Sequence, residues 1–323
     1  MHPCNGVGNK DSCPPTPLII GFSRKTRWRI IGGKMSTENV IKMNMPQVRR
    51  PEFGLENNFP KYYADGNPFL THLLNSLHVV FPEGEKLFIR SVKFFQDEIK
   101  DPQLKARVKG FIGQETQHMA QHEKIWDTFE SQGVKVREYD AWYAKNAYET
   151  VEGTIRKVFG EETYKKLALA VTCALEHYTA TLAEVAIDPE INAMEGFDEN
   201  MKALLMWHAA EEIEHKSVAF DVMQLVDGSQ ITKNAGMVIG TWALLWYGAV
   251  GTVKFMLEDK EIKFTDLPGI MAQKAPKLAK VVSAMVPKIL EYFRPDYHPD
   301  QMANDHLATE YFAANQKFFQ KAG

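Results

Sequence analysis

Glutamates and histidines occupy positions of this chain that amphipathic helices would bury. Apolar residues recur at alternating steps of three and four, the spacing of one helix face, in four stretches: residues 84–100, 102–132, 161–187 and 197–227. The same faces are interrupted only by acids and imidazoles: Glu85, Glu115, His118, His122, Glu176, His208, Glu212 and His215. If these residues lay on solvated faces, the apolar residues beside them would be exposed too. The pattern therefore predicts a polar site inside a helical core.

Buried carboxylates need a counter-charge, because an unpaired one costs several kcal/mol or takes up a proton. Carboxylate and neutral imidazole are ligands that divalent cations favour. Glu115–His118 and Glu212–His215 are Glu-x-x-His motifs, whose two ligands point to the same side of a helix. Lone glutamates, Glu85 and Glu176, precede the two motifs by 30 and 36 residues. One Glu from each of two helices and one Glu-x-x-His from each of two others is the ligand set of dinuclear carboxylate bundles. We therefore predict a site for two metal ions.

Two neighbouring residues leave alternatives open. His122 lies one turn beyond His118, and it is either a ligand or, as we expect, a hydrogen-bonded histidine of the core or pocket. Glu211 precedes Glu212, and it is either an alternative ligand or, as we expect, a residue that holds a ligand imidazole. The sequence indicates no catalytic residue beyond the metal ligands.

The fold class that follows is all-α, since strand-like alternation is scarce. We expect a ferritin-like four-helix bundle over about residues 70–227 and a helical C-terminal extension over residues 228–323. Asp101 before Pro102 predicts a helix start, and Gly133 a helix end. Residues 48–60 are punctuated by proline and glycine and should run over the surface.

The N-terminal region differs from the rest. Residues 1–47 precede a single domain over residues 48–323, and they are expected to be a disordered tail or the product of a start codon placed too early, because Met35 opens a more natural start. Three cysteines in 323 residues provide no disulfide framework, which favours a reducing, cytoplasmic location and a core position for Cys173. The net charge of −3 gives no reason to expect a nucleic-acid partner.

Residues 235–253 form an uncharged run that is long enough to span a bilayer. Its four glycines and two threonines weaken that interpretation. We expect a buried or oligomer-contact helix, as in a homodimer, and keep a membrane-contacting helix as the alternative.

Four motifs resemble those of the ferritin-like family labelled predicted metal-dependent hydrolase: VRRP at 48–51, FPEGE at 81–85, QETQH at 114–118 and WHAAEEIEHKSVAFDV at 207–222. The His208, Glu212 and His215 arrangement is also similar to the extra-histidine di-iron site of p-aminobenzoate N-oxygenase and its relatives. That resemblance, confined to the ligand pattern, implies seven ligands: Glu85, Glu115, His118, Glu176, His208, Glu212 and His215.

The function expected from this site is a di-iron oxygenase or oxidase. It would use two metal ions, iron in preference to manganese or zinc, with dioxygen, an electron donor and a small apolar substrate. The alternative is a metal-dependent hydrolase, because two metal ions can activate a water molecule and stabilise the leaving oxygen. A non-catalytic metal-binding protein is the third interpretation.

Overall fold

A computed structural model describes residues 45–55, 59–316 and 319 of the chain. All regular structure within these residues is helical, and the one β-type contact is an isolated bridge between Ala64 and Phe197. The all-α prediction is confirmed. Of the predicted tail, residues 1–44 lie outside the described residues, so its boundary stays a prediction.

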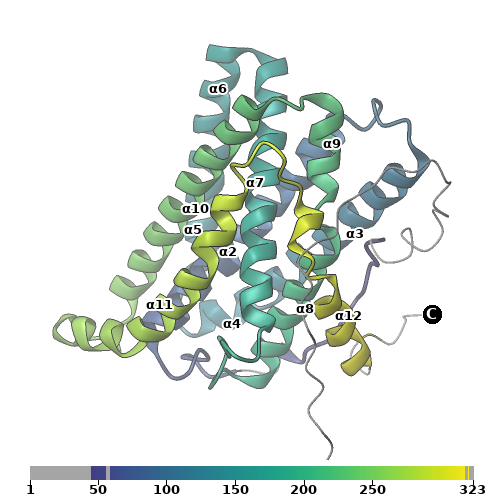
Figure 1. Cartoon of the computed structure of the whole chain (residues 1–323). Helices are drawn as coiled ribbons and strands as arrows, with labels where there is room; N and C mark the ends of the chain where they lie inside the picture. The colour runs from purple at the N-terminus through teal and green to yellow at the C-terminus, as the bar shows by residue number, and fades with distance from the viewer. Residues whose placement is uncertain (1–44, 56–58, 317–318, 320–323) are drawn as a thin grey trace, which may run out of the picture. The chain divides into compact units, whose positions relative to one another are not determined.

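Four helices carry the predicted ligands: α2 (Pro68–Lys93), α3 (Pro102–Lys124), α7 (Glu161–Ile187) and α8 (Glu199–His215). Helix α2 packs against α3 and α7, and α8 packs against α7 and α3 (Figure 1). Each helix therefore has two neighbours within this group, so the polar positions of all four can face one another.

The start of α3 follows the predicted chemistry. The Asp101 side chain accepts hydrogen bonds from the backbone N–H groups of Gln103 and Leu104, and Pro102 occupies the first turn. The helix breaks at Ile125 and resumes as α4 (Trp126–Ser131). Gly133 then takes a φ of 88°, a left-handed conformation that glycine adopts without strain. The second stretch is thus located correctly, although it forms two helices.

The first and fourth stretches have different boundaries from those predicted. Helix α2 begins at Pro68 rather than near residue 84, with the Asn67 side chain accepting a hydrogen bond from the Leu70 N–H, and ends at Lys93 rather than residue 100. The buried face of its first half is largely polar, so no apolar stripe marks it: Thr71, His72, Asn75 and Ser76. The fourth stretch divides into α8 and α9 (Val218–Val226).

Residues 133–160, for which no helix was predicted, form α5 (Val136–Ala144), the π-helix η2 (Lys145–Val151) and α6 (Glu152–Phe159). Helix α5 packs against α2, and α6 packs against α7.

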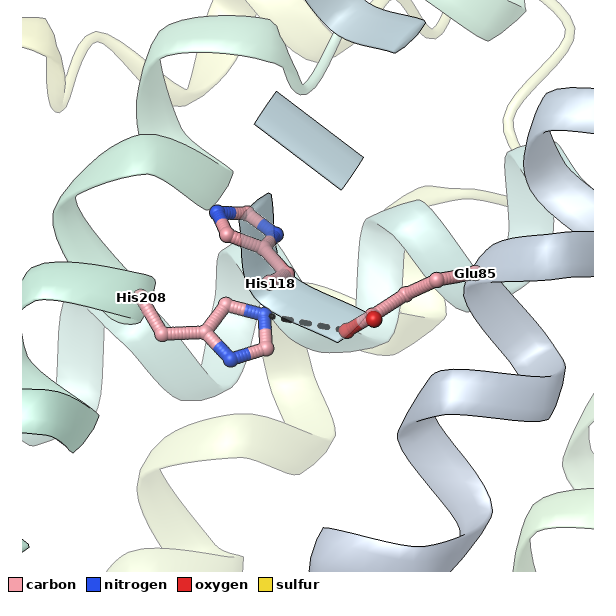
Figure 2. Close-up of side chains that lie close together, drawn as sticks. All are labelled: Glu85, His118 and His208. Atoms are coloured by element: carbon pink, nitrogen blue, oxygen red, sulfur yellow. Dashed lines mark ion pairs between the residues drawn. The ribbon is translucent and has the colours of Figure 1, made fainter. Parts of the chain in front are cut away.

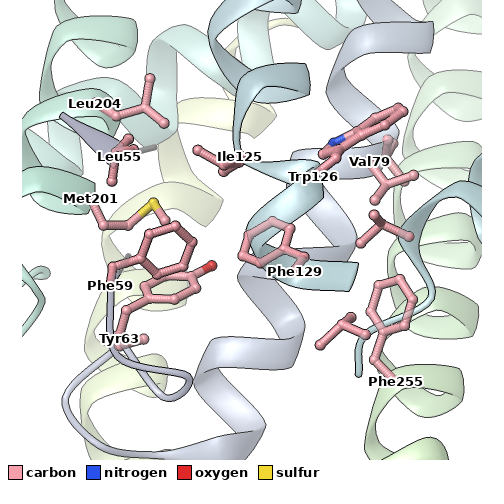
Figure 3. Packing of buried hydrophobic residues seen from close by; sticks show 14 of the residues in the cluster. Leu55, Phe59, Tyr63, Val79, Ile125, Trp126, Phe129, Met201, Leu204 and Phe255 are labelled. Carbon is pink, nitrogen blue, oxygen red and sulfur yellow. The ribbon is translucent and has the colours of Figure 1, made fainter. Parts of the chain in front are cut away.

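The N-terminal extended segment enters the core rather than running only over the surface, which corrects the prediction for residues 48–60. Phe53, Leu55 and Phe59 are buried. Figure 3 shows Leu55 and Phe59 in one cluster with Met201 of α8 and Phe129 of α4. Aromatic and aliphatic side chains on an irregular segment are buried here because the ends of α2 and α8 leave apolar surface to cover.

The C-terminal extension is helical, as expected. It comprises α10 (Gln230–Glu258), η3 (Phe264–Asp266), α11 (Leu267–Glu291), η4 (Pro299–Met302) and α12 (Asp305–Ala314). Helices α10 and α11 pack against α2 and α7, and α12 packs against α8. The extension therefore covers the helices that carry the ligands.

The uncharged run at residues 235–253 lies within α10. Glycines face the protein: a Cβ on Gly236 would lie 2.4 Å from the backbone of Ala170 in α7, and one on Gly251 would lie 2.8 Å from Ser76 of α2. Trp242 and Trp246 are exposed on α10. Among the described residues α10 alone is long and apolar enough to cross a membrane, with 39% of its apolar window buried. Core helices meet the same criterion, so the oligomer contact and the membrane contact both stay predictions.

Candidate metal centre

The four packed helices bring all seven predicted ligands to one place. Helix α2 contributes one residue, α3 two, α7 one and α8 three: Glu85, Glu115, His118, Glu176, His208, Glu212 and His215. Each has a relative exposure of 5% or less. Residues from four helices, 130 positions apart at the extremes, thus share one buried site.

These residues form three overlapping groups whose ligand atoms lie within 4.8 Å of one another. The end groups share no residue: one is Glu85, His118 and His208, and the other is Glu115, Glu176 and His215. A central group consists of Glu115, His118 and Glu212. It shares His118 with the first end group and Glu115 with the second. Two end groups with carboxylates between them match the requirements of two cations.

The first end group combines α2, α3 and α8. Nε2 of His208 lies 3.6 Å from Oε1 of Glu85 and 2.8 Å from Oε1 of Glu212. Figure 2 shows the imidazole of His208 directed at the Glu85 carboxylate, with His118 beside them. Nδ1 of His118 lies 3.4 Å from Oε1 of Glu212. Nitrogen and oxygen donors therefore converge without belonging to one helix.

The second end group is built around His215. Its Nε2 lies 3.1 Å from Oε1 of Glu115, 3.4 Å from Oε2 of Glu176 and 3.3 Å from Oε2 of Glu212. Thr179 of α7 donates a hydrogen bond to the same Glu212 oxygen. This end therefore contains three carboxylates around one imidazole.

The donor atoms fit a pair of divalent cations. Both carboxylate oxygens of Glu115 and of Glu176, Oε2 of Glu85 and Nδ1 of His118 are buried and have no hydrogen-bond partner within the described residues. Buried polar atoms are otherwise almost always partnered. Four carboxylates carry four negative charges, which two divalent cations would balance, and all the unpartnered atoms are types that such ions bind.

Without an ion, the protonation of these groups is strongly perturbed. Burial, together with the neighbouring carboxylates, raises the pKa of Glu85 and Glu176 well above the usual range, and burial also raises the pKa of Glu115. Burial acts in the same direction on Glu212, but the neighbouring imidazoles of His215, His118 and His208 outweigh it and hold its pKa well below that range. The site thus needs positive charge, from protons or from cations.

A pair of polar residues orients the motif histidines. Nε2 of His118 donates to Oε2 of Glu211 at 3.1 Å, so its Nδ1 faces the site. Nδ1 of His215 donates to Oε1 of Gln114 at 3.0 Å, so its Nε2 faces the site. Glu211 thus holds the imidazole of the candidate ligand His118, which is the role expected for it. Glu211 itself lies outside the three groups of candidate ligands. Hydrogen bonds of this kind fix the tautomer of a ligand histidine.

Arg49 links these orienting residues. Its guanidinium donates to Glu211 at 2.9 Å and to Glu214 at 2.8 Å, and Glu214 accepts a hydrogen bond from Gln114 at 2.8 Å. The Arg49 side chain is 13% exposed and that of Glu211 is fully buried. The positive charge of Arg49 therefore offsets the negative charge of Glu211, which directly borders the site.

His122 lies outside the three metal groups, in agreement with its expected role as a hydrogen-bonded histidine. Its Nε2 lies 2.7 Å from Nδ1 of His208, and its Nδ1 lies 2.7 Å from Nδ1 of His78. If Nε2 of His208 binds a cation, Nδ1 carries the proton and donates to His122, which in turn donates to His78. Burial lowers the pKa of His208 to about 4 and that of His78 to about 3, which keeps both neutral.

Sequence reasoning missed three of these residues: Arg49, Gln114 and His78. Two of them lie within motifs that were noted, Arg49 in VRRP and Gln114 in QETQH. The predicted burial of Glu211 was a usable signal for Arg49, because a buried acid beside the site needs a cation. No comparable signal was available for His78, which lies in the predicted bundle but in none of its four apolar stretches.

An apolar cavity of about 400 Å³ reaches one end of the site. Its walls include Glu85, His208 and Glu212, but not Glu115, Glu176 or His215. A second cavity of about 190 Å³ also borders His208 and Glu212. Such volumes are typical of small-molecule pockets. The centre is therefore accessible from the side of His208.

Comparison with known proteins agrees with this geometry. The family described as predicted metal-dependent hydrolase matches residues 47–303, which include every residue of the site. No curated protein and no solved structure matches the chain. The match covers most of the chain, and the chain therefore belongs to the predicted metal-dependent hydrolase family.

Proposed function

We propose that this protein is a metal-dependent hydrolase with a dinuclear centre held by the seven residues named above. The observation that carries the proposal is the set of buried, unpartnered carboxylate oxygens and imidazole nitrogens, for which two cations are the simplest complement. The family description supports hydrolysis over the redox chemistry that the sequence led us to expect. The four helices would then form a ferritin-like bundle, which is part of the proposal.

The chain's own residues have defined tasks in this scheme. Bound metal ions would supply a Lewis acid and an activated water. Glu211 and Gln114 hold the two motif imidazoles in the orientation in which the free nitrogen faces the centre. The larger cavity borders Glu85, His208 and Glu212, and its apolar walls keep bulk water away from them. The substrate would approach the centre through this cavity.

A di-iron oxygenase or oxidase is the second candidate. It is favoured by the donor set itself, four carboxylates and three imidazoles in a buried site, and by the absence of an ionisable acid or imidazole other than these donors among the residues that line the larger cavity. This candidate would need dioxygen and an electron donor. Its substrate would be apolar, as for the hydrolase.

Metal content separates these candidates first. The protein purified from its native host should contain about two metal ions per chain, as measured by elemental mass spectrometry. Zinc or manganese with turnover of p-nitrophenyl esters supports the hydrolase. Iron, with an optical band that appears on exposure to air and oxygen uptake by the ferrous protein, supports the oxygenase.

A matched variant pair makes the result specific. Glu212→Gln removes a central ligand, whereas Glu83→Gln changes an acid of the same helix as Glu85 that belongs to none of the three groups. Activity should disappear in the first and persist in the second. Bound metal with neither hydrolysis nor oxygen uptake would overturn both enzyme proposals and leave a non-catalytic metal protein.

A further inference from the structure

The larger cavity runs along helix α2. Its walls follow α2 from Phe69 to Phe88, which at 1.5 Å per residue is about 28 Å of helix axis. Its volume is about 400 Å³, and on α10 its lining runs from Ala243 to Val253, about 15 Å of helix axis. The candidate ligand Glu85 lies near one end of this path, one turn before Phe88. A rounded ligand of the same volume would need only a fraction of the length.

The walls offer almost no free polar atoms away from the metal centre. The hydroxyl groups that line the larger cavity are engaged: Tyr143 with Tyr148, Tyr178 with Thr241, and Thr252 with the carbonyl of Gly248. Thr179 is bonded to Glu212. The remaining lining residues are aliphatic or aromatic, apart from the candidate metal ligands. The ligand part that occupies the cavity should therefore be a hydrocarbon.

Two glycines from different helices keep the cavity open. Gly84 of α2 and Gly248 of α10 are both buried, and a Cβ built on either meets no atom within 4 Å. A buried glycine with empty space beyond it faces a cavity. A side chain at either position would therefore begin in the cavity and occupy part of its volume.

We propose that this cavity binds the long unbranched aliphatic chain of the substrate, with an oxygen-bearing head group at the Glu85, His208 and Glu212 end. The smaller cavity shares Leu73, Leu77 and Phe81 with the larger one and extends the same apolar wall. The identity of the reacting head group rests on the proposed function, whereas binding of the chain does not.

The test uses the full-length protein as purified and cis-parinaric acid, a fluorescent straight-chain fatty acid. Its fluorescence should rise on binding, and decanoic, dodecanoic, tetradecanoic and hexadecanoic acids should displace it with affinity that increases along the series. Gly248→Leu should weaken binding at least tenfold. Gly153→Leu is the matched control, because Gly153 is also a helical glycine with open space beyond it and lines none of the cavities described.

Each outcome is decisive. Equal affinity of Gly248→Leu and the original chain, or no dependence on chain length, overturns the proposal. Should Gly248→Leu fail to fold by circular dichroism, Gly84→Leu tests the wall on α2 in the same way.

Metal content distinguishes this proposal from the proposed function. If the native protein and Gly248→Leu both hold about two metal equivalents but neither binds the fatty acid, the cavity proposal fails alone. If the fatty acid binds but no metal does, the function fails alone.

Discussion

The two Glu-x-x-His helices, α3 and α8, are alike in sequence and differ in their surroundings. In each, the residue before the motif glutamate holds the histidine of the other helix: Gln114 holds His215, and Glu211 holds His118. This crossed arrangement makes the two motifs depend on each other. Four residues before the motif glutamate, however, α8 has His208 and α3 has Phe111.

That single difference gives the site two unlike ends. The Phe111 ring packs edge-on against His215, with ring centroids 5.0 Å apart, and closes the end that contains Glu176. His208 instead adds a nitrogen donor and borders both cavities. The repeated motif thus accounts for the donors, and the residue one turn earlier decides on which side a substrate can reach them.

The largest loss of metal is expected when a carboxylate of the central group, Glu115 or Glu212, is replaced. These replacements test whether the two ends of the site depend on shared ligands. Glu115→Gln and Glu212→Gln should each lose both ions, because Glu115 belongs to the central group and to one end group, and Glu212 contacts the histidines of both ends. Elemental analysis of the purified variants measures this, with Glu83→Gln as the control that keeps both. If one variant retains two ions, the halves do not share their ligands as proposed.

A smaller loss is expected when α8 is made to resemble α3. His208→Phe should reduce the metal content from about two equivalents to about one, because it removes a donor from the Glu85 end only. The reciprocal Phe111→His should leave the content unchanged. Titration of the metal-free proteins with Zn²⁺ in a calorimeter distinguishes these results. Two equally tight sites in His208→Phe would show that His208 is no ligand.

The stability of the metal-free protein should fall as the pH rises. Burial raises the pKa of Glu85 and Glu176, so their contribution is complete below the ordinary glutamate value of about 4.3 and is lost as the pH rises toward their raised pKa. The loss approaches about 1.4 kcal/mol per pH unit for each proton released. Urea unfolding between pH 5 and about pH 9 tests this.

Variants and metal sharpen this pH test. Glu85→Gln and Glu176→Gln should each flatten the dependence, one at the open end and one at the closed end. The zinc-loaded protein should lack the decline, because a cation replaces the protons. A stability that is independent of pH without metal would contradict the buried, uncompensated state of both acids.

The smallest effect concerns the orienting residues. Glu211→Gln gives α8 the same Gln-Glu pair that α3 has, and the amide oxygen can still accept from His118, so metal affinity should fall by about tenfold. Gln114→Ala removes the acceptor for His215 and should cost about as much or more. Competition with a fluorescent zinc chelator measures both. An unchanged affinity in Glu211→Gln would show that the two orienting residues are interchangeable.

Much of the fold could be predicted from local patterns in the sequence. The start of α3 at Asp101 and Pro102 and the all-α class followed from capping chemistry and periodicity. The first half of α2 and the bounds of α5 and α6 did not, because the buried face of α2 begins with polar residues and α6 has no buried residue at all. Periodicity reveals a helix only when one face is buried and the other is exposed.

The sequence by itself determined which side chains belong together on each helix face, since the spacing of Glu115 and His118, or of Glu212 and His215, is a local property of a helix. It also determined the family, through motifs between residues 48 and 222, and the family model matches residues 47–303.

Only the tertiary structure decided the rest. Arg49 contacts Glu211 across 162 residues, His78 joins His122 and His208, and Gly248 faces a cavity that α2, α7 and α10 enclose together. The physical reason is that orientation, charge balance and empty space at the site depend on contacts between distant helices, which no periodicity along one helix encodes.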